Sequence, residues 1–464
     1  MGNSRLLRRL ELPVSTDEAF AWHERPGAFE RLSPPWDRVD VVERRGTIRN
    51  GDRVTIRLML AGLPVHWVAE HYGYEPGNQF CDRELTGPFA VWNHIHRFQS
   101  AGEQCVLEDD IAFQVPGGPI GRLFGTSHTK QTLDRMFTYR HRLTLDDMTA
   151  HAKYADQPRQ TIAITGATGL VGSQLVAFLS TGGQRPISLL RQLSKPKPGR
   201  PIVGEQGQWN ATTGEVAVPN DAPIDAVVHL AGESIAGGRW NARRKQAIRD
   251  SRIAATRMLC EQLAGMPIKP RVLVCASAIG YYGDRGEETL TEQSAAGTGF
   301  LPEVCRDWEA ATKPASEAGI RVVNLRLGVV LSPQGGALGN MLTPFKIGVG
   351  GVVGSGQQYW SWVALDDVLG AVQHAIFTPS LAGPVNVTAP QPVTNQEFTK
   401  TLGKVLHRPT IFPLPAFAAR FLLGEMADAL LLASAKVLPT KLQATGYDFR
   451  FVNLEDALRH SLGK

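Results

Sequence analysis

Thr165-Gly-Ala-Thr-Gly-Leu-Val-Gly172 is the stretch that decides the fold of this chain, because of the residues that flank it. Before it, residues 160–164 have the pattern of a short buried strand. After it, residues 170–179 carry apolar side chains at helical spacing, and the glycines at 182–183 end that helix. A glycine turn between a strand and a helix can seat a pyrophosphate. The glycines let the backbone approach the phosphates, and the helix N-terminus offers free N–H groups and a partial positive charge.

The glycines of this loop are spaced G-x-x-G-x-x-G rather than G-x-G-x-x-G. With a threonine before the first glycine, the spacing resembles that of the extended and atypical short-chain dehydrogenase/reductases. The resemblance implies that a dinucleotide contacts Gly166, Thr168, Gly169, Leu170, Val171 and Gly172. The alternative is a tight strand-to-helix turn without a ligand.

The composition is that of an ordinary globular protein. The 464 residues predict two or three domains, with 43% hydrophobic and 20% charged residues and a net charge of +5. Lysine and arginine are spread along the chain without a basic block interleaved with aromatics, so we expect no nucleic-acid partner. The five cysteines form no CxxC pair, which indicates neither a zinc knuckle nor a disulfide framework and favours a reducing compartment.

The most apolar stretch, residues 411–432, is interrupted by Arg420, Glu425 and Asp428. This predicts a buried or amphipathic helix rather than a membrane span. No apolar leader segment follows the N-terminus. We therefore expect a cytoplasmic protein.

A polar segment at 151–158, ending in a proline, predicts a linker after a first domain at 1–152. In that domain Ser15-x-x-Glu18 is a capping box that opens a short helix. Alternating apolar residues predict strands separated by glycine-containing turns, and a helix with an apolar stripe from Leu133 to Leu143 closes the domain. The strand candidates lie within 54–60, 65–69, 89–95 and 111–115.

This order of elements resembles the START-like helix-grip fold, an α+β fold of the polyketide-cyclase/SRPBCC superfamily. Residues 31–36 and 87–96 resemble the version that is fused to a reductase-like domain in bacteria. The resemblance implies an apolar cavity and therefore an apolar ligand for this domain.

Two histidines, His94 and His96, fall on the same face of a predicted strand, with His66 and His71 nearby in sequence. No cysteine or carboxylate lies at ligand spacing with them. We therefore expect ordinary hydrogen-bonded histidines and no metal site, with a metal as the alternative.

Downstream of the linker, strands and helices alternate, which predicts a Rossmann-type, doubly wound α/β parallel sheet over 159–380. The strand candidates are 161–165, 186–190, 226–230, 272–277 and 320–325. The second of them ends at Arg191, where an NAD-binding fold usually has an acid for the ribose hydroxyls. An arginine suits the 2′-phosphate of NADP(H) instead, and Lys195 and Lys197 add positive charge. A solvated basic loop is the alternative.

The third candidate strand leads into His229-Leu-Ala-Gly232, whose small residues would let a cofactor pass close to the backbone. Leu230, Ala231 and Gly232 are therefore predicted cofactor contacts. With 252–256 and Gly348-Val-Gly-Gly-Val-Val-Gly-Ser-Gly-Gln-Gln-Tyr-Trp-Ser-Trp362, the chain resembles an atypical reductase family often described as NAD-dependent epimerase/dehydratase or nucleoside-diphosphate-sugar epimerase. Residues 381–464 resemble the C-terminal domain of unknown function of that family, and we expect them to close over the substrate side of the sheet.

Short-chain reductases use a tyrosine four residues before a lysine, with a serine for the substrate oxygen. The tyrosine needs a nearby cation, because a phenol with a pKa of about 10 is a poor base at neutral pH. Ser277 lies at the expected strand end, and Tyr281 and Tyr282 follow it, but the chain contains no Y-x-x-x-K. In extended members the pair lies further on, at positions that here are Leu301 and Cys305.

We predict Ser277, Tyr281 and Tyr282 as catalytic residues, with Ser277 also near the cofactor. The alternative is that the two tyrosines line the cofactor loop. Two functions remain open. One is an NADP(H)-dependent oxidoreductase or epimerase acting on a small organic substrate. The other is a non-catalytic dinucleotide-binding sensor or carrier.

Overall fold

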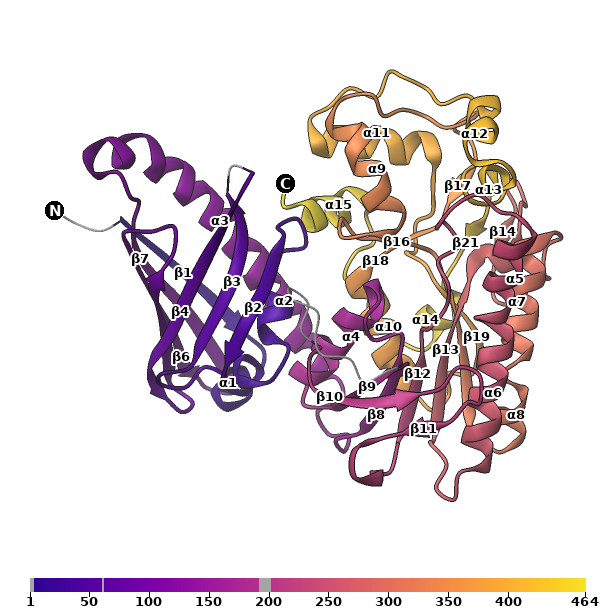
Figure 1. Cartoon of the computed structure of the whole chain (residues 1–464), viewed down its shortest axis with the longest axis horizontal. Coiled ribbons are helices and arrows are strands. Elements are labelled where there is room, and N and C mark those ends of the chain that lie inside the picture. The colour runs from indigo at the N-terminus through magenta and orange to yellow at the C-terminus, as the bar shows by residue number, and fades with distance from the viewer. Residues whose placement is uncertain (1–3, 61, 192–201) are drawn as a thin grey trace.

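The computed structural model describes residues 4–60, 62–191 and 202–464. In these ranges the chain forms a β-rich N-terminal domain, a Rossmann-like domain and a C-terminal part (Figure 1). No helix within the described ranges has the length and apolar character needed to cross a membrane.

The N-terminal domain is an antiparallel sheet with a long helix on one face (Figure 1). Its seven strands have the order β1-β7-β6-β5-β4-β3-β2. They are β1 (Ser4–Leu12), β2 (Val39–Arg45), β3 (Arg53–Leu60), β4 (Leu63–Glu75), β5 (Gln79–Thr86), β6 (Val91–Ala101) and β7 (Gln104–Gln114). The helices are α1 (Thr16–Glu24), α2 (Ala28–Leu32) and α3 (Gly118–Ala152). As predicted, the Ser15 side chain caps α1 by accepting from the backbone N–H of Glu18.

Two apolar clusters form the core of this domain. One gathers around Trp22 and Phe80, and the other joins Trp92 and Phe113 of the sheet to Phe137 of α3. His94 and His96 point to the same buried face, as the sequence predicted. No carboxylate lies at ligand spacing from them along the sequence, but the pairing of β5 with β6 places Asp82 directly opposite His94.

The Rossmann-like domain is an eight-stranded sheet with the order β11-β10-β9-β8-β12-β13-β15-β19. Only β11, at one edge, is antiparallel to its neighbour among these described strands. The strands are β8 (Thr161–Thr165), β9 (Arg185–Leu190), β10 (Glu205–Trp209), β11 (Val216–Ala217), β12 (Ala226–His229), β13 (Val272–Ala278), β15 (Arg321–Leu327) and β19 (Gly383–Val387). This is the doubly wound order that the alternating pattern predicted.

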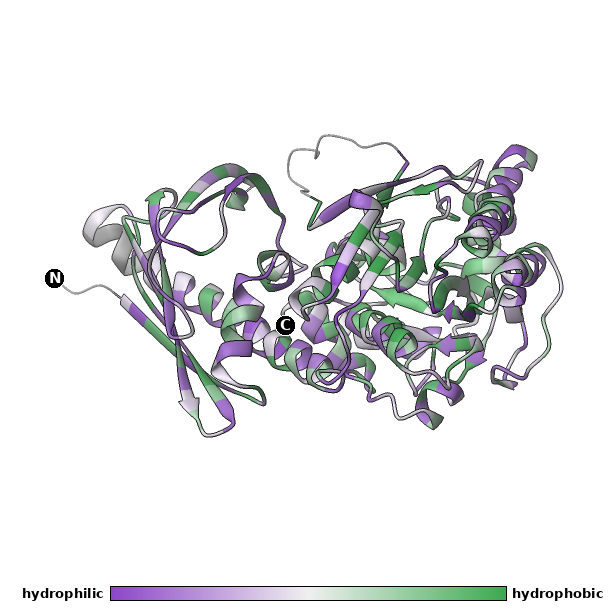
Figure 2. Cartoon of the chain, turned by 90° about the horizontal axis from the view of Figure 1, so that it is seen from below, coloured by the Kyte–Doolittle hydropathy of each residue, from purple (hydrophilic) through white to green (hydrophobic). Residues whose placement is uncertain are grey.

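Helices cover both faces of this sheet. One face packs against α4 (Leu170–Thr181) and α10 (Leu365–Phe377). The other packs against α6 (Ile253–Gly265), α7 (Phe300–Ala310) and α8 (Lys313–Glu317), which follow α5 (Ala242–Asp250). Figure 2 shows apolar residues along the central strands. Because helices cover both faces of the sheet, these strands are nearly continuous apolar runs rather than alternating ones.

The predicted domain boundary after residue 380 is too early. β19 pairs in parallel with β15 and completes the edge of the Rossmann-like sheet. The sequence placed these residues in the C-terminal domain, because the order of strands in a sheet is not a local property of the chain.

The C-terminal part covers the loops that follow the central strands. Its own elements are β20 (Val393–Thr394), α11 (Asn395–Leu406), α12 (Ala416–Leu423), α13 (Glu425–Ala427), β21 (Lys436–Val437), α14 (Thr440–Ala444) and α15 (Leu454–Leu462). The short elements that it packs on are β14 (Thr289–Leu290), β16 (Val329–Leu331), α9 (Gly336–Lys346), β17 (Tyr359–Trp360) and β18 (Trp362–Ala364). The guanidinium of Arg239 donates to the Leu422 carbonyl at 3.1 Å, and Lys245 pairs with Glu425. These contacts place the C-terminal part beside the loop that follows β12.

The predicted single helix at 411–432 is instead divided. α12 ends at Gly424, which has a φ of +63°, and a new helical turn begins there. On α12 the side chains of Phe417 and Phe421 are exposed, so this helix is not buried.

A buried ionic cluster joins the N-terminal domain to the Rossmann-like domain. Arg31 of α2 donates through Nε and Nη2 to both oxygens of Asp147 on α3, each at 2.8 Å. The same Nη2 lies 2.8 Å from Asp366 at the start of α10, and Arg450 donates to Asp147 at 2.8 Å. Burial opposes charge on Asp366, but the adjacent Arg31 guanidinium holds its pKa well below the usual range. The role of Arg31 in the 31–36 segment is therefore to hold the two domains together.

Candidate functional site

The loop after β8 has space only for glycine at two positions. Gly166 has a φ of +71°, and a Cβ there would lie 2.7 Å from the carbonyl carbon of Leu230. A Cβ on Gly172 would lie 2.8 Å from the carbonyl carbon of Gly166. Because both obstacles are backbone atoms, they cannot move aside cheaply. The glycines thus hold the start of α4 close to the ends of β8 and β12.

The N-terminus of α4 is free to receive an anion. Gly169 is the residue that precedes the helix, and no side chain caps it. The backbone N–H groups of the first turn therefore have no partner within the helix, and the helix dipole favours negative charge at this end. Thr168 and Gly169 are exposed here, and Leu170 and Val171 are half-buried. This cradle fits the pyrophosphate of a dinucleotide.

The predicted contacts after β12 lie beside the same loop. The backbone N–H of Ala231 donates to Thr165 Oγ1 at 3.3 Å, and Gly166 approaches Leu230 and Ala231 closely. The structure therefore brings the first glycine of the loop together with the Leu230–Gly232 segment, as the sequence predicted.

A chain of buried hydrogen bonds holds the ends of β8 and β12 in place. His229 Nδ1 lies 2.7 Å from Thr165 Oγ1, and its Nε2 lies 3.0 Å from Thr256 Oγ1, which also accepts from the Trp308 indole. Burial lowers the pKa of His229 to about 4, so the imidazole is neutral at neutral pH. No local sequence pattern indicates a role for His229 or Thr256, because their contact joins residues 27 positions apart.

Arg191 directly follows β9, and its side chain is exposed. It forms no ion pair with any residue that the structure describes. Because β8 and β9 are parallel neighbours, Arg191 and the glycine loop both lie at the carboxyl ends of the strands. Lys195 and Lys197, which we expected to add positive charge, lie outside the described residues.

Arg252 is a second cation at these strand ends, and the sequence did not assign it a role. A Cβ on Gly232 would lie 3.4 Å from the Arg252 guanidinium carbon. The guanidinium stacks on Trp308 at 5.1 Å and donates to the Ile248 carbonyl and the Ser251 hydroxyl. No carboxylate of the described ranges forms an ion pair with it, and burial lowers its pKa. Arg252 is therefore suited to an anionic group of a cofactor or substrate.

Ser277, at the end of β13, belongs to a polar network. Its Oγ donates to Glu309 Oε1 at 2.7 Å, and Arg326 donates to both oxygens of Glu309 at 2.8 Å. The third Arg326 nitrogen donates to the Tyr282 hydroxyl at 2.9 Å, and that hydroxyl donates to Asn386 Oδ1 at 2.7 Å. Glu309, Arg326 and Asn386 come from three other elements, and no local motif could have indicated them.

The two adjacent tyrosines differ sharply in this structure. Tyr282 is fully buried, its hydroxyl is occupied by the partners just named, and burial raises its pKa. The geometry therefore makes Tyr282 a packing and hydrogen-bonding residue rather than a proton donor to substrate, which corrects the prediction for this residue. Tyr281 is half-buried, its ring lies against the Arg326 guanidinium, and its hydroxyl bonds to no described residue.

The positions where extended reductases carry the tyrosine–lysine pair face the same turn. A Cβ on Gly280 would lie 3.5 Å from the Leu301 Cβ and 3.8 Å from the Cys305 Sγ. Burial raises the pKa of the Cys305 thiol to about 12, so at neutral pH it is an uncharged thiol. It therefore offers no positive charge in place of a lysine. The usual acid–base pair has no equivalent at these two positions.

The chain is similar in sequence to proteins of one known family. The model of the NAD dependent epimerase/dehydratase family matches residues 162–387, and a domain of unknown function, DUF1731, matches residues 414–461. An epimerase family protein of Mycobacterium bovis is 42% identical over 300 residues, which span 65% of this chain and 97% of that protein. The chain belongs to the NAD dependent epimerase/dehydratase family.

Two solved structures extend this relationship. A nucleoside-diphosphate sugar epimerase from Corynebacterium glutamicum is 34% identical, with a TM-score of 0.78 over 99% of this chain and 90% of that chain. The human epimerase family protein SDR39U1, solved with NADPH, is 32% identical, with a TM-score of 0.59 over 65% of this chain and 99% of that chain. The match to the bacterial structure includes the β-rich N-terminal domain of this epimerase-family protein.

Proposed function

We propose that this epimerase-family protein binds NADP(H) at the glycine loop and reduces a carbonyl group of a small organic substrate. The observation that carries the proposal is the loop itself, in which backbone atoms exclude a side chain at Gly166 and Gly172 while the start of α4 stays uncapped. Arg191, also at the carboxyl ends of the strands, supports NADP(H) over NAD(H). The human relative, which was solved with NADPH, adds support.

Bound NADPH would supply a hydride, and the protein would have to bind and polarise the substrate oxygen. The single proton of Ser277 Oγ is committed to Glu309, which leaves Tyr281 as the hydroxyl donor at the end of β13. Arg326, stacked on the Tyr281 ring, is the cation beside it. A phenol donates a proton at neutral pH more readily than it abstracts one, so we favour reduction over dehydrogenation.

A second function is supported by Leu301 and Cys305 at the positions of the usual tyrosine–lysine pair. Without that pair the domain could act as a non-catalytic sensor or carrier of NADP(H). The fold of this family does not decide between the two functions.

For the N-terminal domain we propose a START-like module that binds an apolar small molecule. The order of its elements supports this assignment, with one strand, two short helices, six further strands and a long closing helix. The packing of Phe137 on α3 against Trp92 and Phe113 of the sheet also supports it.

Variants at Ser277 and Tyr281 test the reductase proposal. We expect slow NADPH oxidation with one or more aldehydes, ketones or quinones. Tyr281→Phe should lower kcat/KM by roughly tenfold or more, at or below the ~10²–10⁴-fold contribution of a tuned acid. Ser277→Ala should also lower it. Tyr154→Phe, which removes a hydroxyl bonded to His374 away from the strand ends, is the control and should leave kcat/KM unchanged. Turnover that survives both site changes would place the chemistry elsewhere, and no turnover with any substrate would favour the sensor.

A further inference from the structure

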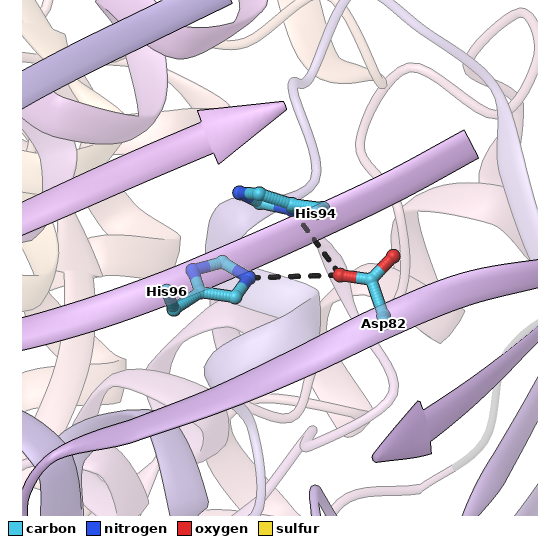
Figure 3. A group of neighbouring side chains, drawn as sticks. All are labelled: Asp82, His94 and His96. Carbon is cyan, nitrogen blue, oxygen red and sulfur yellow. Dashed lines mark ion pairs between the residues drawn. The ribbon is translucent and has the colours of Figure 1, made fainter. Parts of the chain in front are cut away.

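The centre of the N-terminal domain holds a group of histidines and carboxylates that the reductase chemistry does not use (Figure 3). His94 and His96 come from β6, with Asp82 opposite His94 on β5 and Asp109 opposite His96 on β7. Asp82 Oδ2 lies 3.2 Å from His94 Nδ1 and 3.7 Å from His96 Nε2. Three electron-rich atoms from different side chains thus face one point.

The carboxylate of Asp109 contacts the imidazole nitrogens that face away from Asp82. Asp109 Oδ1 lies 3.0 Å from His94 Nε2, and its Oδ2 lies 2.6 Å from His141 Nε2. A proton on His94 Nε2 that is shared with Asp109 leaves the lone pair of Nδ1 directed toward Asp82. A carboxylate bonded to the outer nitrogen of a histidine is the usual support of a metal-binding imidazole.

The Asp82 carboxylate is also held in place. Its Oδ1 accepts a hydrogen bond from the Trp92 indole at 2.8 Å, which leaves Oδ2 for the group it faces. Oδ1 of Asp82 thus fixes the carboxylate, and Oδ2 faces the two histidines.

The two nitrogens of His96 face two different carboxylates. The residue is 9% exposed, and its Nδ1 lies 2.7 Å from Asp109 but is not aligned for a hydrogen bond. Its Nε2, at 3.7 Å from Asp82, is too distant for one. A cation between His96 Nε2 and Asp82 Oδ2 would contact both atoms.

The spacing matches a metal ion. With bonds of about 2.0–2.2 Å, adjacent ligand atoms of a tetrahedral site lie about 3.3–3.6 Å apart. The three atoms of Asp82, His94 and His96 lie within 4.8 Å of one another, and the two separations given above bracket the ideal value. A divalent cation would also balance the negative charge of Asp82 and Asp109, whose side chains are largely buried.

We propose that Asp82, His94 and His96 bind one divalent first-row transition metal ion, with Asp109 and Trp92 as positioning residues. Two imidazole nitrogens and one carboxylate oxygen are ligands that suit Zn²⁺, Fe²⁺ and Co²⁺. Three protein ligands leave a position for water or for a small molecule bound by the domain. The site is independent of the dinucleotide loop.

Metal titration of the full chain tests the site. Protein freed of any histidine tag and dialysed against a chelator is titrated with Zn²⁺ by calorimetry and with Co²⁺ by visible absorption. We expect one ion per chain. His96→Ala and Asp82→Asn should each weaken binding by more than the ~10–100-fold that loss of a supporting residue causes. His66→Ala, at an exposed histidine of the same sheet, is the matched control and should bind normally.

X-ray absorption of the zinc-loaded wild-type chain keeps the proposal falsifiable if a variant fails to fold. It should show two imidazole ligands, with oxygen in the remaining positions. The proposal is overturned if the wild-type chain takes up neither Zn²⁺ nor Co²⁺. It is also overturned if both site variants, folded by circular dichroism, bind as tightly as the control, or if the absorption spectrum shows no histidine ligands.

Discussion

Gly172→Val is expected to weaken NADPH binding on the order of 100-fold while the N-terminal domain stays folded. A Cβ at this position would lie 2.8 Å from the carbonyl carbon of Gly166 and 2.9 Å from the Ala167 Cα, so the valine must push α4 away from the loop. The backbone N–H groups of the helix would then lose their alignment with the pyrophosphate. Charge-assisted hydrogen bonds contribute about 1.5–3 kcal/mol each, so loss of one or two of them weakens binding on the order of 100-fold.

Calorimetric titration with NADPH measures this loss, and circular dichroism checks the fold. The matched control is Gly265→Ala, at the end of α6, where a Cβ would meet nothing within 4 Å. The control should bind NADPH like the wild-type chain. Normal affinity in Gly172→Val would mean that the loop is only a turn.

Arg31→Ala should lower the free energy of unfolding by about 3–5 kcal/mol, because it leaves buried carboxylates without their counterion. Arg31 is 2% exposed and contacts Asp147 and Asp366 at 2.8 Å, and Arg450 compensates only part of their charge. Chemical denaturation measures the loss. Arg45→Ala is the control, since its pair with Glu43 is exposed and should contribute less than ~1 kcal/mol.

This contribution should depend on pH in a defined direction. The ion pairs hold the pKa values of Asp147 and Asp366 below the usual range. The stabilisation is therefore fully present above the unfolded-state pKa of about 4 and is lost as the pH falls further. At pH 7 a wild-type and an Arg31→Ala chain of equal stability would show that the cluster does not hold the domains together.

The parts of the structure that the sequence predicted are those that local patterns encode. The glycine loop, the parallel sheet around it and the capped helix at Ser15 all depend on residues close together in the chain. Arg31 illustrates what local patterns miss, because its partner Asp366 lies 335 residues away.

The site residues divide in the same way. Ser277 was found from its place at a strand end, but Glu309 and Arg326, which engage it, come from α7 and β15. Asp82 and His94 could have been paired only with the register of β5 and β6 in hand. Adjacent tyrosines could not be ranked either, because the short turn that contains them buries Tyr282 and leaves Tyr281 half-exposed.

The central claim is that the glycine loop and Arg191 bind NADP(H), and parallel calorimetric titrations with NADPH and NADH test it most directly. We expect NADPH to bind about ten- to a hundredfold more tightly, because an arginine–phosphate pair contributes roughly 1.5–3 kcal/mol. Arg191→Ala should remove this preference. Arg159→Ala, an exposed arginine before β8 at the opposite ends of the strands, should retain it. Equal affinities for the two cofactors, or an unchanged preference in Arg191→Ala, would contradict the account.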